Sequence, residues 1–154
     1  MPSINSTMIE LCVFKFEHDR PLYLLLKRCK EEKLYPGIWQ YITGSIDGKE
    51  KAIDAAIREL REETGLSPQR FWVVPYVHSF YDPEHDSVSL LPLFAAQVRP
   101  GDVPILSSEH EEYLWLPFEG ARSKLVWPGQ REGLRIVHES IVKGEKSATL
   151  NRIL

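Results

Sequence analysis

The sequence predicts one layered domain in which helices pack on a β-sheet, of the α+β or α/β class. Segments rich in Val, Leu, Phe and Tyr, which favour strands, occur in both halves of the 154-residue chain. Apolar residues recur at helical spacing in two segments, residues 52–64 and residues 130–143. No repeat, low-complexity tract or linker interrupts the chain, so residues 1–154 are expected to form a single domain.

The first third of the chain predicts a β-hairpin, a loop and a short strand. Residues 8–16 and 22–28 are the expected hairpin strands, and the turn between them contains Asp19 and Pro21. Residues 29–37 form a charged loop that ends at Pro36-Gly37, and residues 39–43 form a strand that leads into a turn at Gly44. The central helix, residues 52–64, follows: its apolar residues lie on one stripe, and Gly65 is placed where helices commonly end in a left-handed residue.

The second half alternates strands and loops before a last helix. Strands are expected at 71–81 and 88–98, joined by the polar turn 82–86, and a loop at 99–108 leads to a strand at 112–116. Residues 117–121 begin a short turn or helix. In the final helix, 130–143, the expected inward-facing residues are Leu134, Ile136, Val137 and Ile141.

Composition excludes several classes of protein. The net charge of −3 argues against a broad basic surface for nucleic acid, so no nucleic-acid partner is expected. Cys12 and Cys29 are too few for a disulfide scaffold. No secretory leader is recognisable, and no apolar run approaches the roughly 20 residues that cross a bilayer. The expectation is a soluble cytoplasmic protein without a membrane partner, either a monomer or a homodimer.

The central helix places three carboxylates together. Glu59, Glu62 and Glu63 lie on one arc, because residues three and four apart are neighbours on a helix surface. Like charges so placed cost about 0.2–0.5 kcal/mol per pair on an isolated helix, which favours a compensating cation. Arg58 can reach Glu62 one turn on, but it cannot neutralise all three. Oxygen ligands favour Mg²⁺ or Mn²⁺ over zinc. The alternative is a charged, solvated helix face, which is the commoner reason for such a run.

The complete pattern is more specific than the helix alone. Gly44 is followed by five residues, then Glu50, seven further residues, and then the sequence from Arg58 to Leu66, Arg-Glu-Leu-Arg-Glu-Glu-Thr-Gly-Leu. This pattern resembles the Nudix box, the signature of hydrolases that act on nucleoside diphosphates linked to another moiety. The resemblance implies an α/β fold, a Nudix-type α/β/α sandwich around a central mixed sheet.

The resemblance also implies roles for single residues. The glutamates matching Glu59, Glu62 and Glu63 bind Mg²⁺, for which Mn²⁺ can substitute, and the carbonyl of the glycine matching Gly44 commonly joins them. The residues matching Glu50 and Arg58 hold the helix and its carboxylates in place.

The loop before the helix departs from the family pattern. Family members usually have Gly-Gly at its start and Gly directly before the glutamate, whereas here Gly44-Ser45 opens the loop and Gly48-Lys49 precedes Glu50. Gly48 is expected to supply the residue with positive φ one position early.

A later segment, residues 107–115, resembles the Glu-His-X-X-Tyr-X-Trp stretch of many Nudix proteins. It makes Glu109 the candidate general base or auxiliary metal ligand, beside the catalytic set of Glu59, Glu62, Glu63 and Arg58. A glutamate on a surface loop is the alternative. His110 is expected to form a hydrogen bond within the loop.

Substrate-binding candidates lie outside the box. Arg28 ends a strand where matching residues of relatives meet phosphates, a task that suits a guanidinium. Gln40 belongs to a Trp-Gln-X-X-Thr-Gly-Ser stretch that resembles the dihydroneopterin triphosphate and dATP pyrophosphohydrolase branch. Phe80, Tyr81 and Trp127 could stack on a base or pterin, although core packing is the commoner role of aromatic residues. His78 and His85 lack a third ligand, so no zinc site is expected.

The leading hypothesis is a Mg²⁺-dependent pyrophosphohydrolase that cleaves a nucleoside or pterin triphosphate to a monophosphate and pyrophosphate. A dinucleoside polyphosphate hydrolase of the diadenosine tetraphosphate type is the enzymatic alternative. A non-catalytic nucleotide-sensing domain is the alternative from another class. In each case the partner is a small molecule, a nucleoside or pterin polyphosphate.

Overall fold

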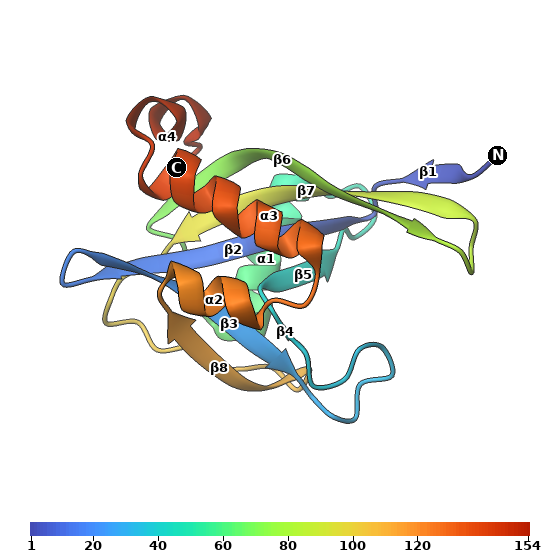
Figure 1. Cartoon of the computed structure of the whole chain (residues 1–154), viewed down its shortest axis with the longest axis horizontal. Coiled ribbons are helices and arrows are strands. Elements are labelled where there is room, and N and C mark those ends of the chain that lie inside the picture. The colour runs from blue at the N-terminus through green and yellow to red at the C-terminus, as the bar shows by residue number, and fades with distance from the viewer.

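A mixed sheet of eight strands lies between helices in the computed structural model, which describes all residues 1–154 (Figure 1). The strands, in chain order, are β1 (Ser3–Asn5), β2 (Met8–Glu17), β3 (Arg20–Arg28), β4 (Trp39–Gln40), β5 (Ile42–Ser45), β6 (Arg70–Asp82), β7 (Ser87–Gln97) and β8 (His110–Leu116). The helices are α1 (Ala52–Thr64), α2 (Phe118–Lys124), α3 (Pro128–Ile136), the π-helix η1 (Val137–Val142) and α4 (Glu145–Asn151).

The sheet combines parallel and antiparallel pairs. Its order is β1-β7-β2-β3-β4, with β5 paired to β2, β6 to β7 and β8 to β3. Strand β7 runs parallel to both β1 and β2, whereas all other pairs are antiparallel. The predicted mixed sheet is therefore confirmed.

Alternation along β2 produces two cores. Ile9, Leu11 and Val13 pack with α1 on one face of the sheet. Cys12 and Phe14 point to the opposite face, where they pack with the last helices and with α2. Helices therefore cover both faces, and the predicted α/β/α sandwich is confirmed (Figure 1).

The hairpin and the central helix form where the sequence predicts them. His18 and Asp19 turn the chain between β2 and β3 with φ values of 51° and 63°, the positive values that tight hairpin turns require. Helix α1 spans the predicted residues, and Gly65 ends it in the left-handed conformation with φ of 69°. No disulfide forms, since Cys12 and Cys29 are both free.

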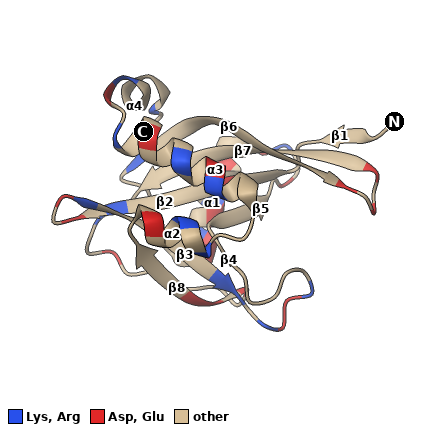
Figure 2. Ribbon diagram, viewed as in Figure 1, with Lys and Arg blue, Asp and Glu red and all other residues tan.

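Other elements differ from prediction. The strand expected at 39–43 is divided into β4 and β5, and the last helix begins at Pro128 and changes to a π-helix at Val137. Proline suits the first helical turn because its missing N–H has no partner there. Strand β1 and helix α4 were not predicted. No helix is long and apolar enough to cross a bilayer, and acidic and basic residues are interspersed over the visible elements (Figure 2).

Candidate metal and phosphate site

The loop between β5 and α1 brings a backbone segment against the carboxylates of the helix. A Cβ atom on Gly44 would lie 2.2 Å from Cδ and 2.3 Å from Cγ of Glu59, so only glycine fits at this position. Gly48 has φ of 51°, which confirms that it supplies the positive φ of the loop. The departure from the usual glycine pattern is thus accommodated within the loop, and α1 keeps its place.

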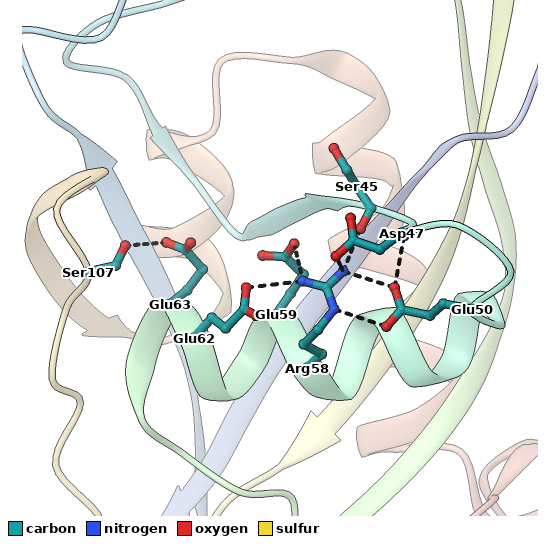
Figure 3. A network of polar contacts seen from close by, with 8 residues as sticks. All are labelled: Ser45, Asp47, Glu50, Arg58, Glu59, Glu62, Glu63 and Ser107. Atoms are coloured by element: carbon teal, nitrogen blue, oxygen red, sulfur yellow. Dashed lines mark hydrogen bonds and ion pairs between the residues drawn. The ribbon is translucent and has the colours of Figure 1, made fainter.

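Arg58 connects this loop to the helix (Figure 3). Its Nε and one terminal nitrogen donate to the two carboxylate oxygens of Glu50, both at 2.9 Å, and the same terminal nitrogen donates to the carbonyl of Ser45 at 2.7 Å. The other terminal nitrogen donates to Glu59 at 3.1 Å and to Glu62 at 3.0 Å. These five hydrogen bonds match the five N–H donors of a guanidinium. The expected contact with Glu62 is confirmed, and Arg58 also holds Glu59.

Charge and burial act in opposite directions on these groups. Hydrogen bonds from Arg58 lower the pKa of Glu50 to about 2, which keeps this carboxylate ionised. Burial raises the pKa of Glu59, although the hydrogen bond and the charge of Arg58 oppose that shift. Arg58 therefore compensates the Glu59 carboxylate only in part, because burial acts more strongly on its pKa.

Glu63 belongs to a second group, formed with the loop before β8. Its Oε2 accepts a hydrogen bond from the Ser107 hydroxyl at 2.8 Å (Figure 3) and lies 2.9 Å from Nδ1 of His110. Burial raises the pKa of Glu63, but the hydrogen bonds from His110 and Ser107 outweigh burial and lower it overall. Burial and the charge of Glu63 raise the pKa of Glu109. His110 is buried, and its hydrogen bond is with Glu63 on α1, whereas a bond within its own loop was expected.

The three helix glutamates are thus divided between two neighbouring groups. Arg58 holds Glu59 and Glu62, whereas Glu63, Glu109 and His110 offer ligand atoms that lie within 4.8 Å of one another. The donors are mainly carboxylate oxygens, and the close approach of the Gly44 backbone leaves room for Glu59 and no room for a side chain. This set of donors fits a hard divalent cation such as Mg²⁺ or Mn²⁺.

The proposed substrate residues are dispersed. Arg28, at the end of β3, donates to the Leu34 carbonyl at 2.9 Å and to Glu32 at 3.3 Å, so its guanidinium is already oriented in the loop. Gln40 is buried in β4. Trp127 precedes α3, and its ring packs edge-on against Tyr35 with centroids 4.9 Å apart.

Phe80 and Tyr81 are adjacent on β6 but make different contacts. Phe80 lies beside His78, with ring centroids 5.7 Å apart. Tyr81 is exposed, and its hydroxyl donates to Asp86 in the turn between β6 and β7. Both contacts lie within β6 and the turn that follows it, and neither involves a carboxylate of α1.

Sequence reasoning missed a buried polar cluster on the face of the sheet opposite α1. Glu10, 1% exposed, contacts His78 and Gln130 at 2.7 Å each. A carboxylate within the apolar strand Met8–Glu17 was the available signal, because such a group is rarely buried without partners. Ser107 was also missed; its place two residues before Glu109 was the only indication.

Known proteins resemble this chain over most of its length. An octanoyltransferase from Myxococcus xanthus is 31% identical over 129 residues, covering 82% of this chain and 35% of that protein. Nudix hydrolase 10 from Arabidopsis thaliana is 30% identical over 184 residues, covering 96% of this chain and 65% of its own. The chain therefore spans about a third and about two thirds of the lengths of these relatives.

The fold has similar solved structures. A diadenosine tetraphosphate (Ap4A) hydrolase from C. elegans superposes with a TM-score of 0.74 at 20% identity, covering 88% of this chain and 96% of that one. The sequence model of the NUDIX domain matches residues 8–136. The sequence pattern of residues 44–66, the α/β/α sandwich and this domain match agree, so the chain belongs to the Nudix family.

Proposed function

We propose that the protein is a Mg²⁺-dependent pyrophosphohydrolase that cleaves a nucleoside or pterin triphosphate to the monophosphate and pyrophosphate. The observation that supports this proposal most is that each of the three helix glutamates has its own defined surroundings. Glu59 faces the Gly44 backbone, Glu62 is exposed, and Glu63 is held by a hydroxyl and an imidazole.

The residues of the site match what phosphoanhydride hydrolysis requires. Bound Mg²⁺ supplies positive charge for the phosphate oxygens and activates water. Glu59, Glu62 and Glu63 would hold it together with the Gly44 carbonyl. Arg58 keeps two of these carboxylates in fixed rotamers, and because precise positioning contributes strongly to catalysis, its role is orientation.

Glu109 is the proposed general base. Glu109 is exposed on the loop before β8, its carboxylate lies within reach of Glu63, and partial desolvation together with the charge of Glu63 raises its pKa. A carboxylate of raised pKa holds an abstracted proton better than an ordinary one, which suits the removal of a proton from attacking water.

Arg28 is the proposed phosphate ligand, since it ends β3 beside the loop that carries Glu109. The backbone N–H of the next residue, Cys29, donates to the carbonyl of Glu109 at 3.0 Å. The resemblance at Trp39-Gln40 supports a nucleoside or pterin triphosphate. The C. elegans neighbour hydrolyses Ap4A by its description, which makes a dinucleoside polyphosphate the substrate to test against.

A hydrolysis panel with product identification tests the proposal. It contains dATP, dGTP, dihydroneopterin triphosphate, diadenosine tetraphosphate and ADP-ribose, each with and without Mg²⁺. Glu63→Gln serves as the inactive blank. Lys49→Gln serves as the active control, because Lys49 is exposed on the loop and its substitution also removes one unit charge. A monophosphate and pyrophosphate from a triphosphate support the proposal. ATP released from diadenosine tetraphosphate supports the alternative hydrolase, and binding without turnover of any compound supports the sensing domain.

A further inference from the structure

A cavity of about 290 Å³ lies between the last helices and the sheet, on the face opposite α1. Small-molecule sites in proteins occupy about 300–1,000 Å³, so its size is close to the lower end of that range. Strand β2 contributes Phe14 and Phe16 to its lining, β6 contributes Trp72, and the π-helix contributes Ile141 and Val142. The cavity therefore has a largely apolar wall built from three separate elements.

This cavity is separate from the metal and phosphate site. Strand β2 leads from one to the other: Ile9 pairs with Gly44, whereas Phe16 lies seven residues further along the strand. At about 3.3 Å per residue, roughly 20 Å separates the cavity from the turn at Gly44. Phe14 and Phe16 also point to the face of the sheet opposite that of Ile9. A molecule in the cavity would not touch the carboxylates of α1.

The wall of the cavity is aromatic and held in place. The ring of Phe14 packs against Trp72 with centroids 5.5 Å apart, and edge-on against Phe16 at 5.8 Å. Nε1 of Trp72 donates to the carbonyl of Ala148 at 2.9 Å, which holds α4 against the start of β6 (Figure 1). Ala148 also lines the cavity. Aromatic faces in such an arrangement can pack against a flat apolar group.

The π-helix lies at this cavity. Ile141 and Val142 are consecutive residues of η1, and both line the wall. Turns of π-helix are rare and frequently occur at functional sites. This irregular turn coincides with the cavity, whereas the metal and phosphate site lies on the other face of the sheet.

Two arginines without acidic partners line the same cavity. Arg70 begins β6 and Arg152 follows α4, and both are exposed, so a ligand can reach them from solvent. Trp72 brings them together: it pairs with Arg152 in an isolated β-bridge, and it lies two residues from Arg70 on one face of β6. Neither guanidinium takes part in an ion pair. Two uncompensated positive charges beside an apolar wall favour a ligand that is both anionic and apolar.

We propose that this cavity is a second ligand site, distinct from the hydrolytic site, and that it binds an organic anion, a carboxylate or phosphate group carried on a flat apolar body. The wall of Phe14 and Trp72 contacts the flat body, and Arg70 and Arg152 bind the anionic group. A guanidinium presents paired N–H donors that match the oxygens of a carboxylate or of a phosphate, so both head groups suit the site. The site does not depend on whether the protein hydrolyses a triphosphate.

Calorimetric titration of the metal-free protein with naphthoate, naphthyl phosphate and naphthamide, all substituted at the same ring position, tests the charge requirement. Each anion is expected to bind at least tenfold more tightly than the neutral amide, a difference of about 1.4 kcal/mol that one charge-assisted hydrogen bond can supply. The tighter of the two anions identifies the preferred head group. Inorganic phosphate, which lacks the apolar body, should bind more weakly than naphthyl phosphate.

Variants show whether the two arginines provide this preference. Arg70→Gln and Arg152→Gln should each lower the preference for the anions over the amide at least threefold, with little change in binding of the amide itself. Both side chains are exposed, so these variants should fold normally. Arg61→Gln removes an exposed arginine from α1, on the other face of the sheet, and should leave all binding constants unchanged.

A local readout identifies where the anions bind. The indole N–H of Trp72 donates to α4 beside the cavity, so its NMR resonance, assigned with Trp72→Phe, should shift on titration with either anion. Ala148→Leu places a larger side chain in the cavity and should weaken binding of all three naphthyl compounds about tenfold.

Three results would each overturn the proposal: equal binding of the anions and the amide, anion binding that both arginine variants leave unchanged, or no binding of any compound. Turnover of a triphosphate together with any of these results would reject this site alone and leave the proposed function standing. Anion binding that the arginine variants weaken, in a protein that hydrolyses no triphosphate, would support this site and reject the proposed function.

Discussion

The contact between Gly44 and Glu59 predicts a large effect from one methyl group. In Gly44→Ala the new Cβ would lie 2.2–2.5 Å from the Cγ, Cδ and Oε1 atoms of Glu59. Carbon atoms pack at about 3.5–4.0 Å, so the glutamate or β5 must move by more than about 1 Å. Overpacking of this kind costs about 1–3 kcal/mol. For a chain of this size the melting temperature should fall by roughly 3–10 °C.

The same displacement should impair turnover more than stability. A shift of about 1 Å in a catalytic group can lower a rate about 100-fold, so we expect kcat of Gly44→Ala to fall by about that factor with little change in KM. Thermal unfolding and Mg²⁺-dependent pyrophosphate release measure the two effects. Gly101→Ala is the matched control, because no atom lies within 4 Å of its added Cβ.

A double-mutant cycle identifies the clash itself. Glu59→Ala removes all three crowded atoms, so Gly44→Ala should cost much less stability in that background, with a coupling of about 1–3 kcal/mol. An equal cost in both backgrounds would show that Glu59 is not what excludes a side chain at position 44. Unchanged stability and turnover of the single variant would refute the argument entirely.

Three further predictions concern catalysis, the core and pH. Glu109→Gln should lower kcat about 10²–10⁴-fold in a steady-state assay without changing the melting temperature, whereas an unchanged rate would exclude it as the base. Leu60→Ala, at a fully buried position under the sheet, should cost about 2–5 kcal/mol in urea unfolding, and a loss below 1 kcal/mol would contradict the packing. Burial and then the charge of Lys143 hold the pKa of His138 below its ordinary value of 6.5, so the unfolded chain binds the proton more tightly. Stability should therefore be constant above about pH 7 and fall as the pH drops through 6.5, and His138→Gln should lessen this fall in urea midpoints measured at pH 7.5 and pH 5.

The sequence predicted those elements whose apolar pattern and end residues lie within the element itself. Helix α1 was predicted from its apolar stripe and from Gly65, and both features act within the helix itself. The π-helix was not predictable, since the spacing of Val137 and Ile141 is compatible with an ordinary helix and the extra residue in the turn depends on packing. Strand β1 has three mostly exposed residues, and α4 has no buried residue, so neither shows an apolar pattern.

The site was predicted at the level of residue types and less well at the level of contacts. The box placed Glu59, Glu62 and Glu63 on one helix, and the structure agrees. Their division between Arg58 and the Ser107–His110 loop depends on a segment more than forty residues later in the chain, and sequence spacing says nothing about which carboxylate that segment meets. The cluster of Glu10, His78 and Gln130 was not predicted for the same reason, because its members come from three separate elements, β2, β6 and α3.

Arg58 has a consequence for how the protein behaves when it lacks metal. Its guanidinium already satisfies Glu50, Glu59 and Glu62, so the acidic helix does not need an added cation to remain folded. Chelation should then abolish activity and leave the unfolding temperature nearly unchanged, in contrast to small domains that fold only around their metal. If Glu59 and Glu62 bind a metal ion as proposed, that ion must compete with the positive charge of Arg58 for both carboxylates. Arg58 would then limit how tightly the ion is retained and would ease its exchange with ions of the surrounding solution.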